Sequence, residues 1–75
     1  TKRCYYTGVE LTLDGSLGLS FDRKDSTLGY TRSNTISCSA IANTLKENLM
    51  ESCDVQQHLS KKEIKKMLLK FAELL

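Results

Sequence analysis

Polar side chains that could form a binding site are concentrated in one stretch of the chain, residues 19–46. Asp22 supplies a carboxylate, two asparagines supply amides that donate and accept hydrogen bonds, and two basic residues supply cations. Gathered at one point, such groups bind a polar or charged ligand; taken alone, Asp22 and Arg23 would form only an ion pair at the end of a strand. The set consists of Asp22, Arg23, Asn34, Asn43 and Lys46.

Two strands, the loop between them and a helix would position these groups. Apolar and polar residues alternate over residues 19–22, which predicts a strand. The polar segment 23–33 predicts a loop, and a second short strand is expected at 34–37. Beyond it, apolar residues recur at helical spacing, and Ser37 or Ser39 is the expected N-cap. The apolar stripe consists of Cys38, Ile41, Ala42, Leu45, Leu49 and Cys53.

The beginning of the chain predicts a small knuckle or hairpin. Residues that favour β-structure surround a turn at Thr7 and Gly8. Val9, Leu11 and Leu13 alternate with polar residues, which predicts a half-buried strand.

The end of the chain carries the strongest local signal. Ser60 followed by Glu63 is a capping box, and Leu59 and Ile64 are spaced as a hydrophobic staple, so a helix is expected to begin here. The apolar face of this helix would consist of Ile64, Met67, Leu68, Phe71 and Leu75.

These patterns predict an α+β fold: a small ββα-type unit, made of an N-terminal β-hairpin, a two-stranded segment and a helix, plus a C-terminal amphipathic helix. A chain of 75 residues is expected to form a single small domain. Its parts would be a knuckle or hairpin at 1–18, the ββα core at 19–53 and the C-terminal helix at 60–75.

The net charge, the apolar runs and the cysteines of the chain bear on its partners and its cellular location. The net charge of +2 is small, and no apolar run approaches the length needed to span a membrane, so no membrane partner is expected. Three cysteines without a Cys-x-x-Cys pair indicate a reducing compartment, and a cytoplasmic location is expected. No charged-then-apolar leader opens the chain, and its start at Thr1 is expected of a processed chain or a fragment.

Three motifs in the first two-thirds of the chain resemble a known family. They are CYYTG from Cys4, FDRKDSTLGYTRSN from Phe21, and IANTLK from Ile41. Together they resemble a small branch of the HNH (His-Me finger) endonuclease superfamily, which is common in bacteriophage and mobile-element proteins. The Asp-Arg-x-Asp-(x)3-Gly-Tyr-(x)3-Asn run is the specific part of this resemblance.

The resemblance implies a ββα unit that holds one divalent cation, Mg²⁺ or Mn²⁺, against a scissile phosphate. Asp22 would be the strand-end carboxylate that ligates the metal, and Asn43 would complete the metal site. Asn34 matches the family's asparagine that orients the base. Hard cations take oxygen ligands, and a carboxylate with one amide oxygen leaves room for water and phosphate.

Arg23 departs from the family pattern at its catalytic position. The family has a histidine there that activates water, whereas a guanidinium stays protonated and cannot accept a proton. Loss of a general base costs about 10²–10⁴-fold in rate. The one histidine, His58, is placed in the linker before the last helix. A degenerate metal-dependent endonuclease, impaired or inactive, is therefore expected, and whether the chain is an enzyme stays open.

The family's zinc knuckles are also absent from the sequence. Thr7 stands where the partner of Cys4 would be, and Ser39 and Ala42 stand where a second pair would precede Asn43. Zinc is therefore not expected, since the remaining set of Cys4, Cys38, Cys53 and His58 has irregular spacing. The simpler expectation is that the three thiols act as buried or half-buried small hydrophobes.

Two functions from different classes remain open. An HNH-like nucleic-acid-binding domain would contact phosphates through Arg23, Lys24, Arg32 and Lys46. A non-catalytic interaction module would bind and modulate a host or partner protein through the basic last helix and the exposed hairpin. The oligomeric state is left open, and a viral chain would act in the host cytoplasm. The lysines of that helix, which otherwise form a solvated face, are Lys62, Lys65, Lys66 and Lys70.

Simpler structural roles compete with several of these assignments. Asn34 is expected to bond backbone groups at the start of the strand, and Asn43 could be solvated helix surface. Tyr30 is expected to anchor the loop to the core, with a base-stacking platform as the alternative. Of Tyr5 and Tyr6, one is expected in the core and the other exposed.

Overall fold

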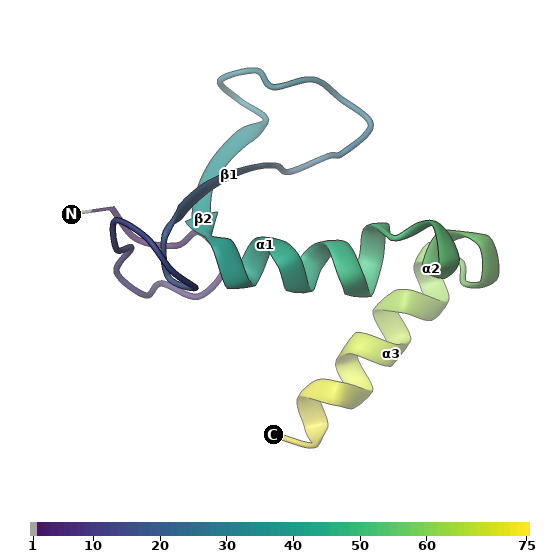
Figure 1. The fold of residues 1–75 in the computed structure, drawn as a ribbon. Coiled ribbons are helices and arrows are strands. Elements are labelled where there is room, and N and C mark those ends of the chain that lie inside the picture. The colour runs from purple at the N-terminus through teal and green to yellow at the C-terminus, as the bar shows by residue number, and fades with distance from the viewer. Residues whose placement is uncertain (1) are drawn as a thin grey trace. The chain divides into compact units, whose positions relative to one another are not determined.

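The computed structural model describes residues 2–75 and has a small α+β fold. The chain divides into two compact units, Thr1–Leu45 and Lys46–Leu75, which are described separately. The predicted single domain over 1–75 stays a prediction. The elements, in chain order (Figure 1), are β1 (Leu19–Arg23), β2 (Thr35–Ser39), α1 (Ala40–Lys46), the π-helical turn η1 (Glu47–Glu51), α2 (Cys53–His58) and α3 (Lys61–Glu73).

The two strands form an antiparallel pair that gives the first unit its frame. Leu19 of β1 is opposite Ser39, and Arg23 is opposite Thr35, so the strands pair over their full length. The long loop of residues 24–34 joins them (Figure 1). Because successive residues of a strand point to opposite faces, the side chains of β1 lie alternately on the two faces of the sheet.

Most of the buried strand residues lie on one face of this sheet, and Ser39 at the end of β2 is the buried residue of the other face. Asp22 is opposite Ile36 and Ser20 is opposite Cys38, and of these four only Ser20 is not fully buried. On the other face, the β1 residues Leu19 and Phe21 are exposed. The difference arises because α1 is fastened to the first face, where the Asn43 Nδ2 donates a 3.1 Å hydrogen bond to the Ser20 Oγ.

The core of the first unit is small and built from small side chains. Cys4, Cys38 and Ala42 are buried together, and Leu11 packs against them. The knuckle, the second strand and the first helix each contribute to it, which ties the N-terminal segment to the ββα elements. A core of this size leaves little margin for the removal of any one contact.

The N-terminal hairpin is present as a tight knuckle with a single antiparallel bridge between Arg3 and Glu10. The Cys4 N–H donates to the Val9 carbonyl at 2.8 Å, and Gly8 adopts a positive φ of 74°, which favours glycine. The predicted half-buried strand from Val9 to Leu13 was wrong. Val9 and Leu13 are exposed and only Leu11 is half-buried, because the segment forms isolated bridges and then turns.

The first helix is shorter than the apolar stripe predicted. Ser39 is the N-cap of this helix, because its Oγ accepts a 3.2 Å hydrogen bond from the Ala42 N–H. It is one of the two residues that were expected in this role. Cys38 lies in β2, not in the helix. After α1 and η1 the chain leaves the helical conformation at Ser52 (ψ 149°), so Cys53 begins a new helix and is exposed.

Two short-range predictions for the second unit can be compared with the structure. The capping box is confirmed: the Glu63 N–H donates to the Ser60 Oγ, and the Ser60 N–H donates to the Glu63 Oε1 at 2.9 Å. The predicted linker position of His58 was wrong, because it is the last residue of α2. Within residues 2–75, no helix is both long enough and apolar enough to cross a membrane.

Candidate functional site

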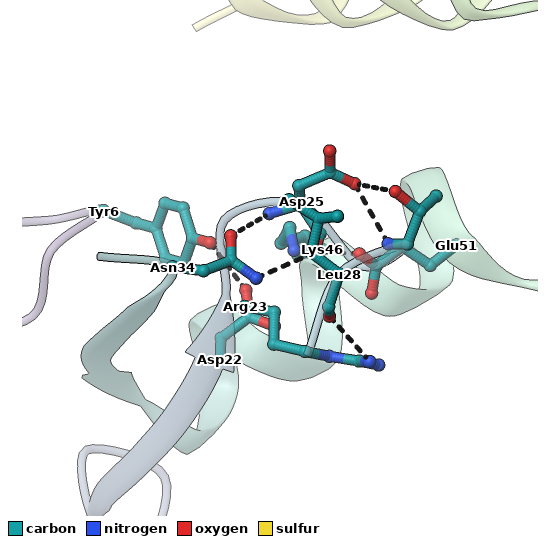
Figure 2. A network of polar contacts seen from close by, with 9 residues as sticks. Tyr6, Asp22, Arg23, Asp25, Leu28, Asn34, Lys46 and Glu51 are labelled. Atoms are coloured by element: carbon teal, nitrogen blue, oxygen red, sulfur yellow. Dashed lines mark hydrogen bonds and ion pairs between the residues drawn. The ribbon is translucent and has the colours of Figure 1, made fainter. Parts of the chain in front are cut away.

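Asp22 is the most buried charged group of the candidate site. Its side chain is 7% exposed, and its Oδ2 accepts a 2.6 Å hydrogen bond from the Tyr6 hydroxyl (Figure 2). A buried carboxylate needs such donors, because an unpartnered charge away from water is costly. Tyr6 was not among the predicted site residues, and nothing local in the CYYTG motif signals that its hydroxyl reaches β1.

Asn43 lies on the same side of the sheet as Asp22. It donates to Ser20, and Ser20 and Asp22 are two residues apart on β1, so their side chains share one face. The alternative of a purely solvated asparagine is thereby excluded, because the Asn43 side chain holds helix and strand together. With Nδ2 used in that bond, Oδ1 is the Asn43 atom suited to ligate a cation.

The donor set on this face is made of oxygens. Asp22 offers a carboxylate, Asn43 an amide oxygen and Ser20 a hydroxyl, which are ligands for a hard cation and not for zinc. Among residues 2–75, no group of three or more His, Cys, Asp or Glu side chains is arranged to hold a metal ion. A cation here would therefore keep several of its waters, as Mg²⁺ commonly does.

Arg23 is not brought together with Asp22. Adjacent residues of a strand point to opposite faces, so the Arg23 side chain leaves β1 on the face away from α1. Its Nη1 donates a 3.2 Å hydrogen bond to the Leu28 carbonyl (Figure 2), and its guanidinium lies over the Tyr30 ring at 5.1 Å from the centroid. The Arg23 side chain thus braces the loop.

Asn34 holds the loop of residues 24–34 in shape through three hydrogen bonds to its backbone. Its Nδ2 donates to the Asp25 carbonyl at 3.1 Å, and its Oδ1 accepts from the Asp25 N–H at 2.9 Å (Figure 2). The Nδ2 also donates to the Gly29 carbonyl at 2.9 Å. The side chain is buried and fully engaged. This is the backbone-bonding alternative, and it accounts for an asparagine at this position without a chemical step.

The basic residues of the loop surround this fixed backbone. Lys24 lies over the Tyr5 ring, with its Nζ 5.6 Å from the centroid, and Arg32 is an exposed turn residue. Asp25 accepts hydrogen bonds from the N–H and the hydroxyl of Thr27, which tightens the tip of the loop. The two cations therefore project from a loop that is ordered by its own polar contacts.

A second polar cluster lies around Cys4 and includes Thr7 and Ser39. The Ser39 hydroxyl lies 3.7 Å from the Cys4 Sγ, and Ser39 also bonds the backbone of Ala42. Burial raises the pKa of the Cys4 thiol, but hydrogen bonds from Thr7 and Ser39 outweigh it and lower the pKa from 9.0 to about 6. Cys4, Thr7, Ser39 and Ala42 thus converge on one small region of the first unit.

The thiols were expected to be buried or half-buried, and this holds for two of the three. Cys4 and Cys38 are buried, whereas Cys53 is exposed at the start of α2. The expectation failed at Cys53 because the helical stripe on which it was placed ends at Ser52.

The remaining basic residues belong to the second unit. Lys46 forms a 2.8 Å ion pair with Glu51, and Lys70 lies 3.8 Å from Glu73. Because the two units are described separately, Lys46 and these lysines are not placed relative to Asp22. On α3, the exposed lysines recur at the spacing of one helical face and are Lys62, Lys65, Lys66 and Lys70.

The predictions for the tyrosines were wrong. Tyr30 is 66% exposed and does not anchor the loop to the core. Tyr5 and Tyr6 are both exposed and meet edge to face, with ring centroids 5.3 Å apart. The core that the sequence was expected to bury them in is built instead from cysteines and alanine.

Compared with known protein families, curated proteins and solved structures, this chain matches none.

Proposed function

We propose that the chain is an HNH-derived nucleic-acid-binding domain whose catalytic activity is impaired or lost. The observation that carries the proposal is the shared face of β1: Asp22 lies on the same face as Ser20, two residues away, and the amide of Asn43 bonds the Ser20 hydroxyl. This is the placement that a ββα metal site requires. Asp22 and Asn43 would hold a Mg²⁺ or Mn²⁺ ion, which offsets negative charge on a bound phosphate.

The Cys4 cluster supports the same ancestry from independent residues. Two pairs of positions, 4 with 7 and 39 with 42, are those that zinc knuckles would use. Cys4 and Ala42 share the core, and Thr7 and Ser39 both bond the Cys4 sulfur. Hydrogen bonds and small apolar contacts then replace the zinc as the link between knuckle and helix.

Loss of activity follows from Arg23. Its guanidinium stays charged at any working pH and leaves the strand on the face opposite Asp22, so it neither accepts a proton nor approaches an ion held there. Arg23, Lys24 and Arg32 are then positive groups for phosphates, and binding should weaken steeply as salt rises.

A metal titration followed by amide chemical shifts tests the ion site. Adding Mg²⁺ or Mn²⁺ at millimolar concentration should shift or broaden signals near Ser20, Asp22 and Asn43 in the wild type. Asp22→Asn should lose the effect, and Asp14→Asn, an exposed carboxylate in a turn, should keep it. The same response in both variants, or none in the wild type, contradicts the ion site.

A gel shift with duplex DNA at two salt concentrations tests nucleic-acid binding separately. Affinity should fall as salt rises, and Lys24→Ala combined with Arg32→Ala should reduce the steepness of that fall. If the chain does not bind duplex DNA at low salt, or if its affinity does not change with salt concentration, binding through phosphates is ruled out.

The α3 lysines favour a second candidate, a protein-interaction module. Lys62, Lys65 and Lys66 are exposed and recur at helical spacing, which suits an acidic protein surface. Capture of partners from a nuclease-treated lysate should then depend on these lysines. Lys62→Glu with Lys66→Glu should abolish capture, while Lys24→Ala should preserve it; the reverse dependence contradicts this candidate.

A further inference from the structure

The sheet face opposite α1 carries aromatic rings that are open to solvent and accompanied by cations. Phe21, on this face of β1, is 52% exposed, and the Lys2 Nζ lies 5.8 Å from its ring centroid. Arg23, two residues along the same strand and therefore on the same face, lies against the exposed ring of Tyr30. We call Lys2, Phe21, Arg23 and Tyr30 the aromatic face.

Geometry and charge on this face match unpaired bases joined by phosphates. The backbones of Phe21 and Arg23 stand about 6.6 Å apart along the strand. Each takes part in one ring-and-cation pair, Phe21 with Lys2 and Arg23 with Tyr30. No Asp or Glu occurs among the strand residues on this face of the sheet. These residues are Leu19, Phe21, Arg23, Thr35, Ser37 and Ser39. Bases can stack on the open sides of the rings while the cations contact the backbone between them.

We propose that the aromatic face binds single-stranded nucleic acid by base stacking. In a duplex the base faces are covered by neighbouring base pairs, so exposed rings gain nothing from it, whereas an unpaired base offers its full π-face. The inference rests on the proposed function for the class of ligand. It uses the face of the sheet opposite Asp22 and Asn43, so the two sites are separable by mutation.

Exposure of these rings is the reason to assign them a ligand. Exposed aromatic side chains contribute nothing to the core, and here each ring has a cation as its neighbour: Lys2 beside Phe21, whose backbone is held in the sheet opposite Ser37, and Arg23 beside Tyr30. Arg23 is fixed in turn by its hydrogen bond to the Leu28 carbonyl. Rings that are ordered before binding lose little conformational freedom when a base stacks on them.

Fluorescence anisotropy with labelled oligothymidylate and oligouridylate of equal length tests the proposal. Phe21→Leu and Tyr30→Leu keep apolar bulk but remove the ring, and each should weaken binding about 5- to 150-fold, the equivalent of ~1–3 kcal/mol per stacked base. Phe71→Leu removes an exposed ring from α3 and should leave binding unchanged. Equal wild-type affinity for both oligonucleotides indicates stacking alone, and a higher wild-type affinity for oligouridylate indicates RNA as the preferred strand.

A second measurement shows whether a loss of binding arises from the missing ring or from misfolding of the variant. Amide spectra should show that Phe21→Leu retains the wild-type sheet, and oligothymidylate should shift signals of the aromatic face in the wild type only. Wild-type affinity in both leucine variants, a preference for duplex, or no single-strand binding at low salt overturns the inference. If duplex binding and the metal response persist in Phe21→Leu while single-strand binding never appears, the aromatic face is wrong and the proposed function stands.

Discussion

Asn43 of α1 and Ser20 of β1 are joined by a 3.1 Å hydrogen bond from Nδ2 to Oγ, on the face of the sheet that also carries Cys38, which is buried in one cluster with Ala42 of the helix. Because Ser20 and Asp22 alternate with exposed residues along β1, Asp22 lies on this face and Phe21 on the other. The two proposed sites therefore lie on opposite faces of one strand: the oxygen donors on one side and the aromatic face on the other.

Removing this contact should loosen α1 from the sheet. Ser20→Ala and Asn43→Ala each delete one partner and should cost about 1 kcal/mol of unfolding free energy. The double variant should cost little more than either single variant, because both report on one bond. Denaturant unfolding of the four proteins measures this; fully additive losses would show that the two side chains act independently.

Asn34→Ala should destabilise the loop of residues 24–34 more than any exposed substitution within it. Three backbone groups lose their partner, and each buried one left unsatisfied costs about 1–3 kcal/mol. Amide hydrogen exchange at Asp25 should accelerate, because its N–H is released from the Asn34 Oδ1. Arg32→Ala, at an exposed turn position of the same loop, should leave both stability and exchange unchanged. Equal effects would contradict the loop-holding role.

Stability should rise with pH as the Cys4 thiol ionises. Its pKa in the folded protein is lowered to about 6, because hydrogen bonds from Thr7 and Ser39 outweigh burial. A group whose folded pKa is depressed adds stability that is fully present above its unfolded value of 9.0 and is lost as pH falls through about 6. The unfolding free energy should therefore increase between these two values, by no more than ~1.4 kcal/mol per pH unit.

Cys4→Ala should flatten this dependence, whereas Cys53→Ser, which changes an exposed thiol, should preserve it. Urea unfolding at a series of pH values separates the two variants. A Cys4→Ala profile parallel to that of the wild type would show that the Cys4 thiol does not titrate in this range.

Introducing cysteines at three positions should create a zinc site. Thr7→Cys, Ser39→Cys and Ala42→Cys together with Cys4 would supply four thiolates at the two knuckle positions, as tetrahedral zinc requires. Since these positions already converge, the triple variant should bind Zn²⁺ and melt at a higher temperature with zinc than without it. Adding Cys4→Ala should weaken zinc binding sharply. A triple variant indifferent to zinc would contradict the convergence of the four positions.

Local chemistry in the sequence determined several features of this protein by itself. Ser60 and Glu63 form a pair whose hydrogen bonds close within one helical turn, so their spacing alone specifies the start of α3. For α1 the sequence offered Ser37 or Ser39 as the N-cap, and the structure selects Ser39. Asn34 likewise bonds residues of its own loop, and this is why its backbone role could be predicted. In each case the partners are near in sequence, so little chain entropy opposes the contact.

Only the tertiary structure decided the contacts between distant segments. Whether the Tyr6 hydroxyl reaches Asp22 depends on how the knuckle docks beside the sheet, and the exposure of Tyr30 depends on a core filled by cysteines and alanine. No periodicity encodes these outcomes, because they are set by the packing of the whole unit. Such contacts first require the closure of long loops, so the same short polar and aromatic motifs are compatible with several arrangements until packing selects one.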